Sequence, residues 1–324
     1  QLSSLVIIAS MIISTGCSVY EPEERNLQPS ELTKTFRLFE ESETNTEMKW
    51  WEAFNDSELN NLIEAGLQNN LDIQQARASL KQAQAALDKA SGSKVPSVSG
   101  GLDASRKRTP GSEDTDSYSF DLSASYELDL WGRVDSLVEA ERLDFKATQA
   151  DLETARISVA GSIAQTWLDI ITTRKEKEIV KLQLENNSAL LDLINFRFEH
   201  SMANALDSLQ QQETVASTRA GIPLLEAKEQ VLLNNLALLL GMSSSDKLQI
   251  NRTDLPKLPP FPALGIPADL LKFRPDIKSA QFNLISSDWD VAAARANRLP
   301  ALNLTGGYGY SASEMSLLFD NWFI

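Results

Sequence analysis

Four carboxylates are spaced so that pairs of them could act in acid–base catalysis. Asp121, Glu127 and Asp129 occupy alternate positions of one segment, and Asp103 takes a similar position in the segment before it. Two facing carboxylates could form a general acid–base pair. Residues two apart in a β-strand share one face, and serines fill most of the other positions on this face. We therefore interpret the four acids as the lining of a polar lumen, which would favour cations.

The sequence shows no motif for catalysis or for a bound cofactor. Its single histidine, His200, and its single cysteine are too few for a Cys/His zinc site, and we interpret His200 as a solvated helix end. Neither a phosphate-binding nor a dinucleotide-binding glycine motif is present, and no serine or cysteine nucleophile has a plausible base. We predict no catalytic residue, no metal and no cofactor.

The lone cysteine, Cys17, points to lipidation. An apolar run over residues 5–13 is followed by Ser14-Thr15-Gly16 directly before Cys17. The run is too short to span a bilayer and is typical of a signal-peptide core. Small residues before a cysteine are typical of a lipoprotein box, in which the thiol is lipidated and becomes the mature N-terminus. Ser18 favours an outer-membrane address. The alternative is an ordinary cysteine in a cleaved signal.

The composition argues against a nucleic-acid partner and against a membrane-spanning helix. The net charge of −15 argues against a nucleic-acid partner, which would require a basic face. The hydrophobic share of 42% is ordinary for a folded protein. After the N-terminal run no 18 consecutive apolar residues occur, so we do not expect a helical membrane span.

An internal duplication organises the chain. A shift of 204 residues aligns Asp72 with Asp276 and Pro96 with Pro300. Further matches between them are Ile73 with Ile277, Ala76 with Ala280, Leu80 with Leu284 and Ala90 with Ala294. Each copy runs from a helical pattern through a proline into an alternating segment. Repeats of one unit indicate a wall of equivalent pieces, which suits a conduit better than a pocket.

The alternating segments predict a pair of membrane strands over residues 95–108 and 118–130. The apolar face of the second strand carries Tyr118, Phe120, Leu122, Ala124, Tyr126, Leu128 and Leu130. Each segment is long enough to cross a bilayer, which takes about 9–11 tilted residues. The alternative is an antiparallel sheet with one wet face.

Two helical patterns of unusual length flank a short break. The first covers residues 136–200 and would reach about 95 Å at 1.5 Å per residue. The second covers residues 205–240 and is interrupted at Gly221-Ile222-Pro223. Because Pro223 removes a helix hydrogen bond, we expect a kink there.

These patterns divide the chain into five parts. They are a signal peptide with a lipobox (1–17), an extended lead-in (18–57), a first structural repeat (58–241), a proline-rich strap (242–274) and the start of a second repeat (275–324). Asp56 is the expected N-cap of the first helix, and the second repeat supplies a third strand after Pro300. A fourth strand is expected to return beyond the given chain, because three strands cannot satisfy their edges in lipid.

An ordered set of motifs resembles the TolC-like outer-membrane factors. The set comprises Trp50-Trp51-x-x-Phe54, Asn70-x-Asp72-Ile73, the run from Tyr126 to Arg133 and the run from Ile222 to Ala227. The branch most similar is the lipoprotein channels of resistance-nodulation-division efflux pumps (NodT/OprM type). The resemblance implies a homotrimer that combines α and membrane β structure. Each subunit would give four strands to one 12-stranded outer-membrane β-barrel, which a long periplasmic α-helical barrel continues.

The resemblance also implies partners and a periplasmic tip. The implied partners are a periplasmic adaptor (membrane fusion) protein, an inner-membrane pump and outer-membrane lipid. Arg197, Ser201, Met202 and Asp207 fall at the tip that meets the adaptor. Ser201 stands where the family usually has glycine, and Asp207 matches an acid that forms part of a salt-bridge lock in some members. The alternative for Asp207 is a charge at a helix N-terminus that the helix dipole favours.

Together these features predict a lipid-anchored channel in the outer membrane of a Gram-negative bacterium, extending into the periplasm. The predicted function is the exit duct of a tripartite efflux system that passively conducts small toxic compounds or drugs. One alternative is a type I protein-secretion duct. The other is a non-conducting structural lipoprotein.

Overall fold

The computed structural model of the chain describes residues 22, 49–108, 110–111, 114–243, 248–257, 273–320 and 322–323. The predicted signal peptide, Cys17, most of the lead-in and the central part of the strap lie outside the described residues. The chain divides into two compact units. Of the described residues, the first unit contains residue 22 and those from 79 to 150 and from 277 to 323, and the second contains those from 49 to 78 and from 151 to 276.

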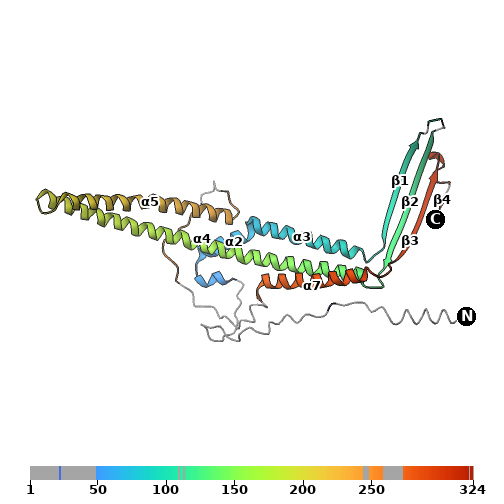
Figure 1. The fold of residues 1–324 in the computed structure, drawn as a ribbon, viewed down its shortest axis with the longest axis horizontal. Coiled ribbons are helices and arrows are strands. Elements are labelled where there is room, and N and C mark those ends of the chain that lie inside the picture. The colour runs from blue at the N-terminus through green and yellow to red at the C-terminus, as the bar shows by residue number, and fades with distance from the viewer. Residues whose placement is uncertain are drawn as a thin grey trace. The chain divides into compact units, whose positions relative to one another are not determined.

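Most described residues belong to long helices and one sheet (Figure 1). The helices are α2 (Ser57–Asn69), α3 (Leu71–Gly92), α4 (Arg133–Glu199), α5 (Ala205–Leu239) and α7 (Pro275–Ala296). The strands are β1 (Ser97–Lys107), β2 (Thr115–Leu128), β3 (Leu302–Ala312) and β4 (Trp322–Phe323), with short 3-10 helices at Trp50–Phe54 (η1) and Met315–Leu317 (η2). None of the helices described is both long and apolar enough to cross a bilayer.

The first unit contains an antiparallel sheet in the order β1-β2-β3-β4. Its register places polar residues opposite polar residues on one face. Ser99 of β1 lies across from Ser123 of β2, with their hydroxyl oxygens 2.8 Å apart. On the opposite face, Tyr126 of β2 lies across from Leu304 of β3. The sheet has the expected four strands, but the fourth lies within the given chain and not beyond it. Trp322 pairs with Tyr310 and Phe323 with Gly309, so β4 runs antiparallel to β3 at the edge of the described sheet.

The duplication is visible in the elements themselves. Helix α7 begins and ends 204 residues after α3, and β1 and β3 have the same length of 11 residues. In the first unit α7 packs on α4 through small side chains: Ala292, Ala293 and Ala296 are buried, and the Ser286 hydroxyl donates to the Ala140 carbonyl at 3.2 Å. Small residues let the two backbones approach closely, so the helices lie side by side.

The second unit has an apolar core around Trp167, whose side chain is fully buried. Ile63 of α2, Ile163 of α4 and Leu236 of α5 are also fully buried in this core. Asp56 is the N-cap of α2 and accepts from the Leu59 backbone amide at 3.0 Å, which confirms the expected helix start. This core is where α2, α4 and α5 meet.

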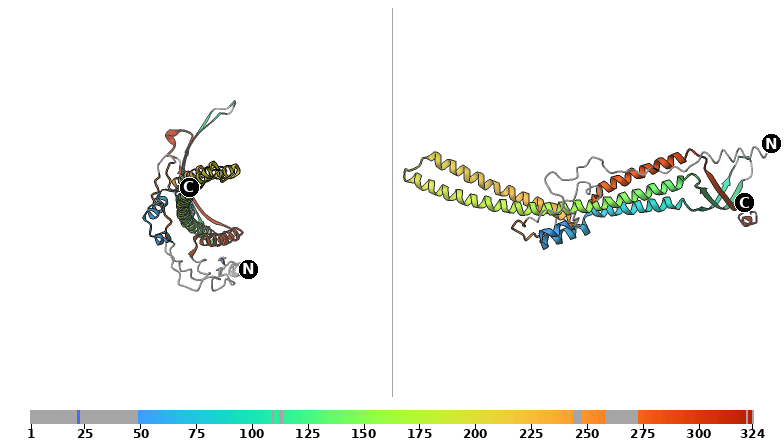
Figure 2. Two further views of the ribbon diagram at one scale, coloured as in Figure 1. Left: turned by 90° about the vertical axis from the view of Figure 1, so that its left-hand side faces the viewer. Right: turned by 90° about the horizontal axis from the view of Figure 1, so that it is seen from below.

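Beyond this core α4 and α5 run side by side as an antiparallel hairpin (Figure 2). The predicted interruption of the second helix was wrong. Helix α5 continues from Ala205 to Leu239 with Pro223 in its interior. Proline removes one helix hydrogen bond, but the turns on both sides of Pro223 keep theirs, so the helix is maintained. A bend at Pro223 remains a prediction.

Candidate functional site

The polar face of the sheet carries the first group of candidate residues. Asp103 lies across from Ser119, and Asp121 lies between Gly101 of β1 and Gly309 of β3. A Cβ atom on Gly101 would stand only 2.8 Å from Oδ1 of Asp121, so the glycine provides the space that the carboxylate occupies. Asp103 and Asp121 therefore lie on the same face as single acids separated along the strands, and not as a facing acid–base pair.

An aromatic ring on the polar face is a feature that the sequence analysis did not single out. Phe323 of β4 pairs with Gly309, and a Cβ on Gly309 would come within 2.6 Å of the Phe323 ring. An aromatic side chain over a glycine of the neighbouring strand is a known way to stabilise a sheet edge. The transverse row of Gly101, Asp121, Gly309 and Phe323 therefore combines one carboxylate with one ring.

The other two predicted lining acids make contacts at the end of β2, and their place in the lumen remains a prediction. The Glu127 carboxylate accepts two hydrogen bonds from Arg133, at 2.8 and 2.5 Å, in a partly buried ion pair. Asp129 lies beyond the end of β2, and its Oδ2 accepts from the Asp135 backbone amide at 2.8 Å in the first turn of α4. A bidentate ion pair and a helix-start bond both fix backbone direction. Glu127 and Asp129 thus fix the direction of the segment that connects β2 to α4.

This junction contains a small pocket that sequence reasoning also missed. The pocket measures about 90 Å³ and is lined by residues that include Trp131, Arg133 and Asn297. The Trp131 indole donates to the Pro300 carbonyl at 2.9 Å and so connects the two repeats. Arg133 and Trp131 were quoted as parts of a motif, but their partners are 6 and 169 residues away, which no local pattern encodes. No group of three or more acids, histidines or cysteines that could hold a metal occurs among the described residues.

The tip of the α4–α5 hairpin contains the third group of candidate residues. Helix α4 ends in a Schellman motif, in which the Met202 amide donates to the Arg197 carbonyl at 2.7 Å and the Ser201 amide donates to the Phe198 carbonyl at 2.9 Å. Ser201 has φ = 60°, in the left-handed region that favours glycine. The turn therefore forms without glycine, at the cost of some backbone strain.

Asp207 lies in the first turn of α5, where Asn204 is the N-cap. Its backbone amide donates to Asn204 Oδ1 at 2.8 Å, and its carboxylate accepts from the Asn204 amide at 3.2 Å, which is a reciprocal capping box. Both bonds are local, so this geometry supports the helix-terminal role for Asp207. A part for Asp207 in a salt-bridge lock remains a proposal.

The hairpin near its tip has polar contacts inside and apolar side chains outside. The Ser208 hydroxyl bonds Asn195 at 2.7 Å, and the Asn187 amide bonds Thr218 at 3.2 Å across the seam. The outward residues Phe196, Phe198, Met202, Leu206 and Leu209 are all exposed. An isolated helical hairpin buries its apolar side chains in the seam. The reversed arrangement leaves an apolar surface that further helices can cover.

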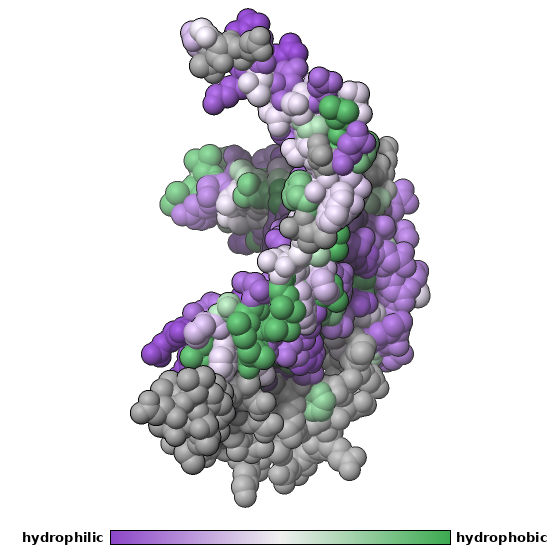
Figure 3. Space-filling view, turned by 90° about the vertical axis from the view of Figure 1, so that its right-hand side faces the viewer, coloured by the Kyte–Doolittle hydropathy of each residue, from purple (hydrophilic) through white to green (hydrophobic). Residues whose placement is uncertain are grey.

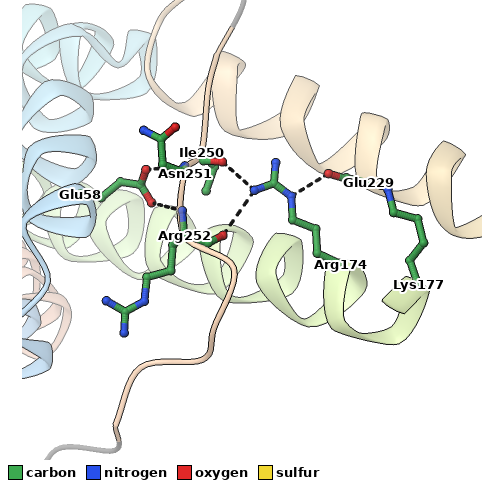
Figure 4. A network of polar contacts seen from close by, with 7 residues as sticks. All are labelled: Glu58, Arg174, Lys177, Glu229, Ile250, Asn251 and Arg252. Atoms are coloured by element: carbon green, nitrogen blue, oxygen red, sulfur yellow. Dashed lines mark hydrogen bonds and ion pairs between the residues drawn. The ribbon is translucent and has the colours of Figure 1, made fainter. Parts of the chain in front are cut away.

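A network of polar contacts, which we call the belt, fixes residues 250–252 to the second unit (Figure 4). The Glu58 carboxylate of α2 accepts from the backbone amide of Asn251 at 2.7 Å, and the Arg174 guanidinium of α4 donates to the Ile250 carbonyl at 2.6 Å. Arg174 also reaches Glu229 of α5 at 2.7 Å. A single guanidinium thus joins the extended segment to both long helices.

Glu229 is the charge centre of the belt. Burial alone would raise the pKa of Glu229, but hydrogen bonds from Lys177 and Arg174 outweigh it and hold that pKa below its ordinary 4.5. The Lys177 ammonium lies 2.6 Å from the second carboxylate oxygen, and the Glu229 side chain is only 14% exposed. The carboxylate is therefore charged at neutral pH and satisfied by two cations.

The sequence matches one family of known proteins over most of its length. A family model described as "Outer membrane efflux protein" matches residues 62–242 and 266–323. The chain belongs to this family. It is therefore an outer-membrane protein, and the resemblance drawn from the motifs is confirmed.

Curated relatives carry the same kind of name. The pyoverdine export outer membrane protein OpmQ of Pseudomonas putida is 34% identical over 287 residues, which are 85% of this chain and 61% of OpmQ. The outer membrane protein OprJ of Pseudomonas aeruginosa is 33% identical over 83% of this chain and 58% of OprJ. The chain thus spans roughly three fifths of the length of these relatives.

Solved structures agree on the fold. The outer-membrane channel OprN superposes with a TM-score of 0.80 at 26% identity, covering 94% of this chain and 72% of OprN. CusC superposes with a TM-score of 0.76 at 25% identity, covering 95% of this chain and 70% of CusC. The predicted fold class is confirmed: the efflux protein combines long helices with a four-stranded antiparallel sheet in the TolC-like arrangement.

Proposed function

We propose that this efflux protein is the outer-membrane exit duct of a tripartite efflux system and passively conducts small toxic compounds or drugs to the exterior. The two-faced sheet carries the proposal. One face carries serines along β1 and β2 together with Asp103 and Asp121, and the other carries leucines along β1, β2 and β3 and tyrosines along β2 and β3. Such strands suit a barrel with a wet interior and a lipid-facing exterior. The duct has no chemistry of its own, and the pump supplies the energy.

The proposed assembly is a homotrimer with four strands from each subunit. Strand β1 has no second partner strand within the described residues, and β4 begins at Trp322 as the outermost strand. Unpaired strand edges are not tolerated in lipid, so neighbouring copies must close the sheet. The apolar surface and turn at the tip, including Arg197, Ser201, Met202 and Asp207, would contact the periplasmic adaptor. A lipid on Cys17 would anchor each subunit, and mass spectrometry of the mature N-terminus would detect its acyl chains.

The substrate is set by the pump and not by the duct. The names of the relatives differ in this respect: one is a pyoverdine export protein, another a toluene efflux pump protein of Pseudomonas putida, and a third a cation efflux protein of Escherichia coli. Proteins with one fold thus carry names with unrelated cargoes, so we assign this chain no individual compound.

Ion selectivity of the full-length protein in planar bilayers tests the proposal. Asp121→Lys should shift permeability toward anions, because Asp121 stands clear on the polar face between two glycines. Asp121→Asn keeps the shape and removes the charge, so it should give a smaller shift in the same direction. Absence of any conductance from the full-length protein, or unchanged selectivity in both variants, would contradict the pore assignment.

A type I protein-secretion duct is the second candidate. The Toxin and drug export protein A of Aggregatibacter actinomycetemcomitans is 25% identical over 324 residues, and its name covers both kinds of cargo. A deletion strain separates the two functions. Increased dye accumulation with normal protein secretion supports the efflux duct, and the reverse result supports the secretion duct.

A further inference from the structure

The apolar face of the sheet has a shallow groove that no side chain of the described residues fills. Its volume is about 280 Å³, and its walls include Pro96, Tyr126 and Leu304. The register explains the groove, because Ala124 lies across from Gly306 between two larger cross-strand pairs. These flanking pairs are Tyr126 with Leu304 and Leu122 with Tyr308. A row of two small residues between two rows of large ones leaves a depression.

The floor of the groove is open at Gly306. A Cβ atom built on Gly306 meets nothing within 4 Å, whereas one on Gly309 of the same strand would collide with the Phe323 ring. The groove therefore has room for atoms from outside the sheet. Figure 3, viewed from the end where the strands lie, shows hydrophobic side chains exposed among hydrophilic ones. Val98, Leu122, Leu304 and Tyr308 are exposed on this same face of the sheet.

The surroundings of the groove favour one type of occupant. This inference rests on the proposed function, in which the apolar face of the sheet meets the hydrocarbon of the outer membrane. The volume is just below the range of about 300–1,000 Å³ of drug-sized pockets, which suits part of one hydrocarbon chain. Lys94 precedes the lining residue Pro96 by two positions in the chain and forms an exposed ion pair with Asp135 at 2.6 Å. A cation two residues from the wall of an apolar groove matches a phosphate above an acyl chain.

We propose that this groove binds one acyl chain of a membrane phospholipid, with Lys94 near the phosphate of the headgroup. The site is separate from the polar face and from conduction. It would hold one lipid per subunit against the sheet at the level of Ala124 and Gly306.

Native mass spectrometry of the full-length protein tests this site. The protein is reconstituted with phosphatidylethanolamine and phosphatidylglycerol and then released into mild detergent. The wild type should retain one non-covalent phospholipid per subunit. Gly306→Leu and Ala124→Leu each fill the groove and should lose it. Ala104→Leu adds the same side chain to the same face across from Tyr118, away from the groove, and should retain the lipid. Gel filtration and circular dichroism would confirm that each variant is folded.

The results separate the possible occupants. The proposal would be overturned if Gly306→Leu and Ala124→Leu retained as much phospholipid as the wild type. It would also be overturned if the wild type retained none. A phospholipid that appears only after Cys17→Ser would mean that an acyl chain on Cys17 fills the groove, which also overturns it. Lys94→Gln should reduce the retained lipid, and unchanged retention would remove Lys94 from the site.

Discussion

The helices α4 and α5 end in the same kind of turn under different constraints. Ser201 after α4 and Gly241 after α5 both adopt a left-handed conformation, with φ values of 60° and 68°. At the tip Ser201 is exposed, and only the backbone angle restricts the residue type. At the belt end, a Cβ on Gly241 would overlap the backbone carbonyl of Asn69, so packing also demands glycine.

The same difference extends to the surroundings of the two turns. The tip depends on local bonds, such as the capping box of Asn204 and Asp207, within three residues. The end of α5 is held by the side-chain amide of Asn70, which donates to the Leu239 carbonyl at 2.9 Å. These two residues are 169 positions apart in the chain. Buried long-range contacts raise the free energy of local opening. We therefore expect the tip to open more readily than the belt and the core beside it.

Removal of the core indole should have the largest effect. Trp167→Ala removes a fully buried side chain whose indole also donates to Glu58 at 3.2 Å. The substitution should lower the free energy of unfolding by about 3–5 kcal/mol. Chemical denaturation followed by circular dichroism measures the loss. Trp50→Ala is the matched control, because Trp50 is exposed, and its cost should stay below about 1 kcal/mol. Equal costs would contradict the distinction between core and surface.

Gly241→Ala should have the next largest effect. The left-handed backbone costs alanine about 1–2 kcal/mol, and overlap with Asn69 adds about 1–3 kcal/mol. A lowered melting temperature of the purified protein checks this. Ser201→Ala keeps a Cβ at the exposed left-handed site and should change stability little, which distinguishes packing from backbone angle.

Loss of the belt carboxylate should cost about 2 kcal/mol, because Glu229→Gln leaves Arg174 and Lys177 without their counter-charge. The lowered pKa of Glu229 also fixes the sign of the pH dependence: its stabilisation is present above pH 4.5 and is lost as pH falls through the folded pKa below that value. Denaturation at several pH values should therefore show that the free energy of unfolding falls less steeply toward acid pH in Glu229→Gln than in the wild type. Glu176→Gln breaks an exposed pair with Lys228 and should change stability by less than about 1 kcal/mol.

Ser201→Gly should give the smallest effect and the opposite sign. Glycine adopts φ = 60° without strain, so the tip should gain about 0.5–1 kcal/mol. Hydrogen exchange of the amides near residues 201 and 202 should slow, while exchange in the core around Trp167 stays the same. Faster exchange at the tip would mean that the Ser201 hydroxyl contributes more than the strain costs.

Sequence periodicity anticipated the elements but not their partners. The alternation in β2 indicated which side chains share a face, because that period is a property of one strand. It did not indicate that Glu127 bonds Arg133 and that Asp129 bonds the start of α4, and the lumen lining by these two acids remains a prediction. The fourth strand was expected beyond the given chain because the two residues of β4 are too few to show a period, and only their pairing with β3 defines them. The interruption was predicted from Gly221-Ile222-Pro223 alone, yet the turns on both sides keep α5 continuous.

By itself the sequence determined the local features of this efflux protein: the repeat at 204 residues, the two-faced strands, the N-cap at Asp56 and the long helices. These depend on propensity and period within a few residues, which a single chain displays directly. Only the tertiary structure decided the belt around Arg174, the glycine space beside Asp121 and the groove at Gly306. Each of these depends on which strands or helices become neighbours. That choice minimises the free energy of the whole fold and leaves no local pattern in the sequence.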